Sequence, residues 1–292
     1  MVLNICINNK MKNLILVDIS YVSFYRFFAT IRWYSMAHAE EFAKYKADTK
    51  YDWYENKIFM EKYEKMYMES ILKLVKKKIF NNSTIIFCMD SPKENLWRTQ
   101  LSSNYKGDRA DLSLKHDFKQ VFSYTYTTMI PNIIKSNPTI HKIRIDEMEA
   151  DDIIAIITMY MEEKHADIPI YLLSGDSDFL QLGRPNVIFI NFKTKKPIIL
   201  TKEEAYKALQ SKIVLGDVSD NIPSIFPQGK RIKKKLILES DENLKEYLNK
   251  NPEAKLIYEK NTKLIDFKFI PKKFINKAQK EFIIIVNLQT IN

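Results

Sequence analysis

Four short apolar runs in this chain each lead directly into acidic residues. The runs NLILVD and STIIFCMD end at Asp18 and Asp90, HKIRI at 141–145 leads into DEMEADD, and IPIYLLSGD reaches Asp176. Apolar runs of this length, separated by longer segments, are typical of strands buried in a parallel sheet between helices. The carboxyl ends of parallel strands share one edge of the sheet, where such proteins bind ligands. We therefore expect these acids to converge on one site.

The segments between these runs complete an α/β pattern. We expect strands at 13–20, 83–91, 141–145, 168–178 and 186–192, helical segments at 21–78 and 150–164, and mainly helical structure after Leu200. The predicted fold class is α/β, with a central, mainly parallel sheet flanked by helices. The aromatic and charged segment 31–70 is interpreted as packing helices.

The composition excludes several classes of protein. The net charge of +10 favours a polyanionic partner, either nucleic acid or a membrane surface. Two cysteines do not suffice for a disulfide framework, and Cys88 lies within an apolar run where a buried thiol is expected. No apolar run approaches the roughly 20 residues of a membrane helix, and the first residues lack the pattern of a signal peptide. We therefore expect an intracellular protein of the cytoplasm or nucleus, neither secreted nor membrane-bound.

Carboxylates that converge repel one another, so a cation is expected between them. A site of oxygen ligands without histidine or cysteine suits the hard ions Mg²⁺ and Mn²⁺. Two such ions roughly 4 Å apart can activate a water molecule and stabilise the leaving oxygen of a phosphodiester. A basic surface would hold the phosphate backbone of the same substrate. Acidic strand ends in a basic chain therefore favour a metal-dependent nuclease.

Each acidic motif also has a purely structural interpretation. In EADD, acids at a helix start can cap free N–H groups and complement the helix dipole. Asp18 and Asp90 can each be a turn residue after a strand, and GDSD can be an Asx turn. GDVSDN has the pattern of a glycine that ends a helix, followed by capping residues. The common position at strand ends favours a shared site, while both interpretations stay open for each single motif.

Between residues 14 and 223 the chain contains five blocks in this order: LILVDISYVSFYRFF, IFCMDSPKENLWRTQLSSNYKGDR, EMEADDIIA, LLSGDSDFLQL and GDVSDNIP. Together they resemble the flap endonuclease and 5′→3′ exonuclease family, most closely its phage and bacterial polymerase I branch. The second block resembles the family's run of Asp, Arg and Tyr-Lys-x-x-Arg, with the residues Asp90, Arg98, Tyr105, Lys106 and Arg109.

The resemblance implies a PIN-like nuclease core at 1–200, with a helical arch at about 100–140. A helical DNA-binding lobe would follow at 201–292, with a degenerate helix-three-turn-helix-like motif. The implied activity is structure-specific hydrolysis of DNA at 5′ flaps, nicks or branched junctions, in replication, repair or recombination. DNA is the implied partner, and RNA is compatible. The implied cofactor is a pair of Mg²⁺ ions, for which Mn²⁺ would substitute. The oligomeric state stays open.

The resemblance also implies roles for single residues. The ligands of the first ion would be Asp18, Asp90, Glu149 and Asp151. Those of the second would be Asp176, Asp178 and Asp217, and the residues that support the ions, directly or through water, would be Asp152 and Asp220. The groups that contact the scissile phosphate and stabilise developing charge would be Lys106 and Arg109. Further substrate contacts would come from Arg98 and from Tyr105, whose ring would stack on a base near the cut.

The downstream motif departs from the family's pattern. A glycine-rich hairpin usually follows SDNIP, but here the text is SIFPQGKRIKKK, in which Gly229 is the remaining glycine. Backbone N–H groups approach phosphate most easily at glycine, so the motif is expected to be distorted and the case for a monovalent-ion site is weakened. The basic residues Lys230, Arg231 and Lys233 could compensate by charge, or form a solvated face.

Three other functions are compatible with parts of the pattern. A non-catalytic DNA-binding scaffold on the same fold would be favoured by a missing acid, and none is missing. A haloacid-dehalogenase-type phosphatase needs an aspartate two residues after its nucleophile, where this chain has Ser20. A PIN-type ribonuclease is usually shorter and lacks GDVSDNIP.

Overall fold

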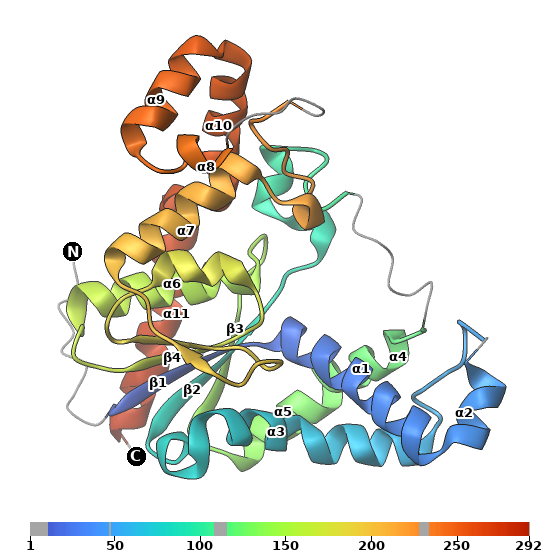
Figure 1. Cartoon of the computed structure of the whole chain (residues 1–292). Helices are drawn as coiled ribbons and strands as arrows, with labels where there is room; N and C mark the ends of the chain where they lie inside the picture. The colour runs from blue at the N-terminus through green and yellow to red at the C-terminus, as the bar shows by residue number, and fades with distance from the viewer. Residues whose placement is uncertain (1–10, 47, 108–115, 228–233, 292) are drawn as a thin grey trace.

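The computed structural model describes residues 11–46, 48–107, 116–227 and 234–291, which form a mixed sheet covered by helices (Figure 1). Six strands lie in the order β3-β2-β1-β4-β5-β6. Their bounds are β1 Asn13–Asp18, β2 Ser83–Met89, β3 Ile140–Arg144, β4 Ile170–Leu173, β5 Val187–Ile190 and β6 Pro197–Ile198. The first five are parallel and β6 is antiparallel to β5. The predicted α/β class with a mainly parallel sheet is confirmed, and β6 is an addition.

Strand β1 lies at the centre of the sheet because both of its faces are apolar. Leu14 and Leu16 face one core cluster, and Ile15 and Val17 face the other. The chain proceeds outward from β1 to β2 and β3, then returns to the other side of β1 with β4. This reversal leaves a crevice at the carboxyl ends of β1 and β4, which is the usual ligand position in such sheets.

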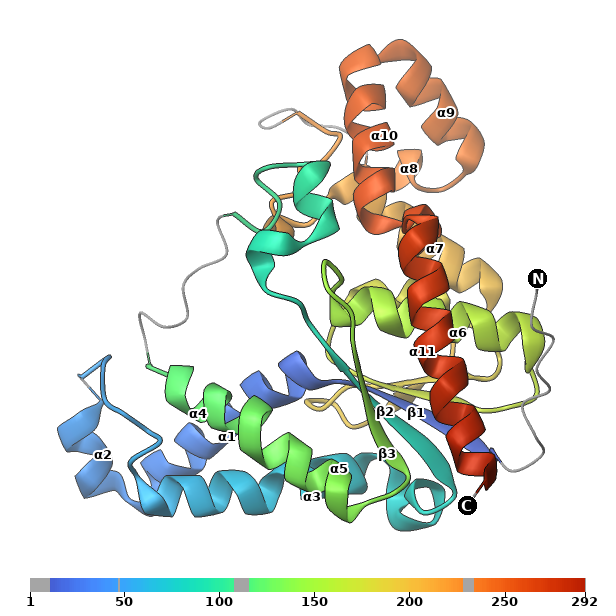
Figure 2. The same cartoon turned by 180° about the vertical axis from the view of Figure 1, so that it is seen from behind.

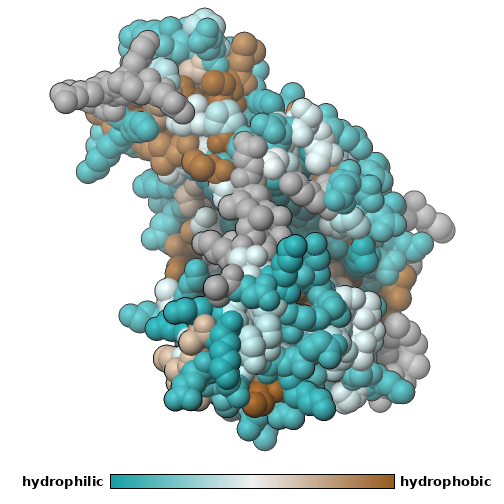
Figure 3. Space-filling view, turned by 90° about the vertical axis from the view of Figure 1, so that its right-hand side faces the viewer, coloured by the Kyte–Doolittle hydropathy of each residue, from teal (hydrophilic) through white to brown (hydrophobic). Residues whose placement is uncertain are grey.

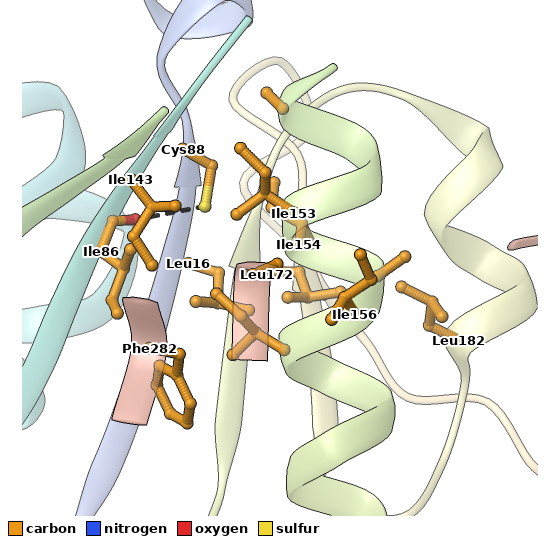
Figure 4. Close-up of a cluster of buried hydrophobic side chains, with 14 of the residues drawn as sticks. Leu16, Ile86, Cys88, Ile143, Ile153, Ile154, Ile156, Leu172, Leu182 and Phe282 are labelled. Atoms are coloured by element: carbon orange, nitrogen blue, oxygen red, sulfur yellow. Dashed lines mark hydrogen bonds between the residues drawn. The ribbon is translucent and has the colours of Figure 1, made fainter. Parts of the chain in front are cut away.

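Two helical layers cover the sheet (Figures 1 and 2). One face is covered by α6 Ala150–Lys164 and α11 Lys272–Ile291, and Figure 4 shows Ile153, Ile154 and Phe282 from these helices packed toward Leu16 and Leu172. The helices of the other face are α1 Ile19–Ala37, α3 Lys57–Phe80, α4 Lys119–Tyr124 and α5 Ile130–Ser136. A π-helical turn, η4 Thr125–Met129, joins α4 to α5.

Cys88, on β2, lies in the core cluster between the sheet and α6 and α11, and it is fully buried, as expected from its apolar run. The other cysteine, Cys6, lies outside the described residues.

The prediction of one helical stretch at 21–78 is wrong for the middle of that range. The chain forms α1, a short α2 at Ala39–Tyr45, an irregular segment, and then α3. The carboxylates of Asp48 and Asp52 accept hydrogen bonds from backbone N–H groups two residues on, so they favour turns over helix. Trp53 fills the gap between the helices and is 1% exposed. The packing role predicted for the aromatic residues of 31–70 is therefore confirmed.

The predicted arch region is partly described. Its part from α4 to α5 packs on the core through Val121, Met129 and Ile130, while 108–115 lies outside the described residues. The arch therefore stays a prediction. In the parts of the chain that the structure describes, no helix is long and apolar enough to cross a bilayer.

The helices α7 Lys202–Leu215, α8 Lys234–Ile237, α9 Asp241–Lys250 and α10 Pro252–Ile265 follow the sheet, and we call them the helical lobe. It has a small core of its own that includes Phe226 and Leu244. Figure 3 shows apolar atoms gathered over the upper part of one face, where this lobe lies, above a mostly hydrophilic lower part. The division expected at residue 200 stays a prediction, but α11 lies with the sheet and not with the lobe.

Candidate active site

A pocket of about 320 Å³ opens at the carboxyl ends of β1 and β4. Its lining includes the acids Asp18, Asp90, Glu149, Asp151 and Asp176, together with Lys106. These acids come from four separate stretches of the chain, and the parallel sheet brings them to one edge, as the sequence predicts.

Each acid is held by local structure as well as by its strand. Asp18 ends β1 and caps α1, because its carboxylate accepts the backbone N–H of Tyr21 at 3.0 Å. The hydroxyl of Ser174, just after β4, donates to the same carboxylate at 2.9 Å. Asp90 accepts the N–H of Ala150, the first residue of α6, at 2.7 Å. Asp18 thus caps a helix instead of forming a turn, and Asp90 holds the start of α6; these bonds orient the two carboxylates toward the pocket.

Two acids of this pocket, Asp18 and Asp151, have raised pKa values. Burial, with added repulsion from Asp90 and Asp176, raises the pKa of Asp18 from 3.8 to about 7. Burial, followed by the charges of Asp176 and Asp18, raises the pKa of Asp151 well above its usual value. A bound cation would favour the ionised form of both carboxyls.

The raised pKa of Asp18 makes the stability of the metal-free protein depend on pH. The folded state keeps this proton up to pH of about 7, whereas the unfolded state releases it near 3.8, so stability falls as pH rises through this interval. We expect the free energy of unfolding in EDTA to fall by up to about 4 kcal/mol across it. Urea unfolding at several pH values measures this, and Asp18→Asn should flatten the curve; an equal slope in the variant would contradict the assignment.

The negative charge of Glu149 is paired with positive side chains, in contrast to those of Asp18 and Asp151. Its carboxylate contacts the Lys106 ammonium, and its other oxygen accepts from the Arg98 guanidinium at 2.8 Å. The Tyr105 hydroxyl lies 3.1 Å from the same oxygen. Although burial opposes it, Lys106 and then Arg98 lower the pKa of Glu149. Glu149 is thus ionised but already engaged, so a metal ion there would compete with these partners.

Asp152 lies beneath the pocket and is fully buried. It pairs with Arg98 at 2.7 Å, accepts from the Trp97 indole at 2.8 Å, and caps α6 through the N–H of Glu149 at 3.2 Å. The capping interpretation of EADD is correct for this acid. Asp152 therefore supports Glu149 from below, together with Arg98.

A second acidic group adjoins the first. Carboxylate oxygens of Asp178, Asp217 and Asp220 lie within 4.8 Å of one another, an arrangement that could hold a metal ion. Asp220 is also linked to the first group, because its backbone carbonyl accepts the N–H of Lys106 at 3.0 Å. The ammonium of Lys212, on α7, contacts Asp178 and lies 2.8 Å from Asp217.

The motifs of this second group are also turns, as their sequences suggest. Asp176 accepts the N–H of Asp178 at 2.9 Å in an Asx arrangement. Gly216 ends α7 with a φ of 73°, and a Cβ there would lie 2.4 Å from the carbonyl oxygen of Ile222. Only glycine tolerates both conditions, so GDVSDN needs its glycine to turn Asp217 toward Asp178.

The donor set fits hard divalent cations. Every potential ligand among the residues described for the two groups is a carboxylate, and neither group includes histidine or cysteine. The raised pKa values of Asp18 and Asp151 mark the place where a positive charge would be most favourable.

Sequence reasoning located the acids but missed some of their partners. Lys212 and Ser174 were not predicted, although SKIVLGD places Lys212 one helical turn before the glycine that ends α7. Tyr105 and Arg98 were expected to contact substrate, but they are 6% and 3% exposed, with their polar groups bonded inside the protein. Four predicted substrate or catalytic residues lie outside the described residues, namely Arg109, Lys230, Arg231 and Lys233.

Comparison with known protein families shows which family the chain belongs to. The family model for the 5′–3′ exonuclease N-terminal, resolvase-like domain matches residues 13–210, more than half of the chain. The chain belongs to the 5′–3′ exonuclease family. The resemblance seen in the five sequence blocks is thus confirmed, and the chain is a 5′ nuclease, a hydrolytic enzyme.

Relatives of this exonuclease include phage and bacterial proteins. Ribonuclease H of Enterobacteria phage T4 is 26% identical over 231 residues, which are 74% of this chain and 75% of that protein. DNA polymerase I of Streptococcus pneumoniae is 29% identical over 167 residues, which are 54% of this chain but 18% of the polymerase. The exonuclease thus spans less than a fifth of that relative.

Solved structures share the fold of this exonuclease over nearly its whole length. A structure of the bacteriophage T5 5′-exonuclease with zinc matches with a TM-score of 0.62 at 18% identity, covering 94% of this chain and 99% of that one. A structure of the T5 flap endonuclease with DNA and metal ions matches with the same TM-score, identity and coverage. At this identity the likeness confirms the predicted nuclease fold.

Proposed function

We propose that this chain is a structure-specific, divalent-metal-dependent 5′ nuclease that hydrolyses DNA at 5′ flaps, nicks or branched junctions. One observation carries the proposal: a chain with a net charge of +10 gathers two adjoining groups of carboxylates at a single edge of its sheet. The T5 relative whose structure contains DNA and metal ions supports the choice of substrate. Replication, repair and recombination are the processes that supply such substrates, which implies an intracellular location.

The two groups divide the proposed ligands between two ions. Asp18, Asp90, Glu149 and Asp151 would hold the first, and Asp176, Asp178 and Asp217 the second. The ions, Mg²⁺ with Mn²⁺ as a substitute, would supply activation of a water molecule and stabilisation of the leaving oxygen. The products would carry a 5′-phosphate and a 3′-hydroxyl.

Other residues of the chain would bind, orient or balance charge. Lys106 lines the pocket, where we propose that it contacts the scissile phosphate once substrate draws it from Glu149. Arg109, outside the described residues, is proposed to assist it. Arg98 and Asp152 would hold Glu149 in position from beneath the pocket. Base stacking by Tyr105 remains a prediction, and it would require the ring to leave its buried position.

A cleavage assay on a panel of substrates tests the proposal. The panel holds a 5′-flap duplex, a nicked duplex, a blunt duplex, a four-way junction, and a flap whose 5′ strand is RNA, each with Mg²⁺, Mn²⁺ or EDTA. We expect the flap or nicked duplex to be cut with either ion and to stay intact in EDTA. Binding without cleavage would support the scaffold alternative, cleavage of RNA alone would support the ribonuclease alternative, and equal cleavage in EDTA would contradict the metal dependence.

A further inference from the structure

The ammonium of Lys212 lies against two acids of the second acidic group, Asp178 and Asp217, and near Asp176. This ammonium contacts Asp178, lies 2.8 Å from Oδ2 of Asp217, and lies 3.9 Å from Oδ1 of Asp176. The side chain is 17% exposed, so the ammonium lies among the carboxylates and not in bulk solvent. These three acids are the same residues that are proposed to hold the second ion.

The acids of the two groups are paired differently. In the first group, Glu149 pairs with Lys106 and Arg98, while burial and neighbouring carboxylates raise the pKa values of Asp18 and Asp151. In the second, burial of Asp217 is outweighed by its bonds from Lys212 and Ser219, which lower its pKa to about 2. The ammonium of Lys212 is thus the counter-charge of Asp178 and Asp217.

The backbone of Lys212 is held by packing, whereas its side chain is long and flexible. Its neighbours on α7, Ile213 and Val214, are buried at 1% and 0% exposure and anchor the last turn of the helix. Lysine bears its charge on a flexible four-carbon stem that can swing without moving the helix. A divalent ion and the ammonium would both need the oxygens of Asp178 and Asp217, so they cannot occupy the group together.

We propose that Lys212 is a built-in counter-ion of the second acidic group, and that the second divalent ion binds only when this ammonium withdraws. The lysine therefore weakens the second ion's binding and makes it depend on displacement of the ammonium from Asp178 and Asp217. This inference rests on the proposed function, because it takes the second group to be a metal site.

Mn²⁺ titration of the EDTA-stripped full chain by calorimetry tests the inference. Lys212→Gln removes the ammonium, and the matched control Lys207→Gln removes the same charge from an exposed position on the same helix. We expect the weaker class of Mn²⁺ sites to tighten about tenfold or more in Lys212→Gln, and to change less than about twofold in the control. Equal affinities in wild type and Lys212→Gln would overturn the inference.

Thermal unfolding keeps the test decisive if Lys212→Gln is poorly stable. Without the ammonium the acids of the second group repel one another, so we expect a lower melting temperature in EDTA and a larger rise on adding Mn²⁺ than in wild type. If Lys212 had only a structural role, its substitution would lower the melting temperature equally with and without Mn²⁺, and that result would overturn the inference.

The titration also separates the inference from the proposed function. If wild type and Lys212→Gln both bind no Mn²⁺, the proposed function itself fails. If wild type binds two ions and only the Lys212 effect is absent, the proposed function survives.

Discussion

Asp176→Ala is expected to abolish cleavage of a 5′-flap duplex, with a loss of about a thousandfold or more, while DNA binding changes less than about threefold. Asp176 lines the first acidic group and raises the pKa values of Asp18 and Asp151, so its charge is felt in that pocket. It also orients Asp178 through the Asx hydrogen bond at 2.9 Å. Its removal therefore disturbs both proposed metal sites, and a thousandfold loss corresponds to about 4 kcal/mol of transition-state stabilisation.

Single-turnover cleavage in Mg²⁺ and fluorescence anisotropy in EDTA separate the two effects of Asp176→Ala. Asp146→Ala is the matched control, because Asp146 is an exposed aspartate that begins the same acidic stretch as Glu149 but does not line the pocket. It should cleave at the wild-type rate. If Asp176→Ala also cleaved at that rate, its assignment as a metal ligand would be wrong.

Arg98→Ala is expected to destabilise the fold by roughly 3–5 kcal/mol, since it removes one partner of a buried ion-pair network. The guanidinium is 3% exposed, pairs with Glu149 at 2.8 Å and Asp152 at 2.7 Å, and donates to the carbonyl of Leu264 at 2.8 Å. The substitution would leave two carboxylates buried with less compensation. Equilibrium unfolding in urea at neutral pH measures the loss.

The exposed pair of Lys73 and Glu69 provides the comparison for Arg98→Ala. This pair lies on the surface of α3 at 3.0 Å, with side chains 62% and 39% exposed. Lys73→Ala should cost less than about 1 kcal/mol, because water screens an exposed pair. A loss for Arg98→Ala no greater than that for Lys73→Ala would show that the buried network contributes little to stability.

The sheet was predictable from sequence because four of its five parallel strands are continuous apolar runs; β3, IHKIR, was found from its isoleucines and lies one residue from the predicted 141–145. The other predicted ranges extend beyond their strands, as in 168–178 against Ile170–Leu173. The strand β6 was not predictable, since two residues pairing with β5 give no periodic signal. The break at 46–56 depends on Trp53 packing between helices, a tertiary contact that helical periodicity cannot reveal.

The acids of the site were predictable because they lie in short motifs that follow a strand or a helix end. The cations that pair with these acids were not predictable. Arg98 and Lys106 both pair with Glu149, although Lys106 also lines the pocket, and only tertiary structure decides which cation meets which carboxylate. Lys212 was missed for the same reason: its sequence neighbours indicate a helix end, and its contact with Asp178 depends on how α7 lies beside the turn after β4.

The position of the last helix limits how this protein can be shortened. Phe274, Ala278 and Phe282 on α11 are fully buried against the layer that contains α6, although they come after the whole lobe in the chain. A fragment that stopped near Leu200 would bare this apolar face and would be prone to aggregate. The intervening 202–265 cannot simply be cut out either, because Leu264 and Ile265 pack on Tyr105 and the carbonyl of Leu264 accepts the buried guanidinium of Arg98.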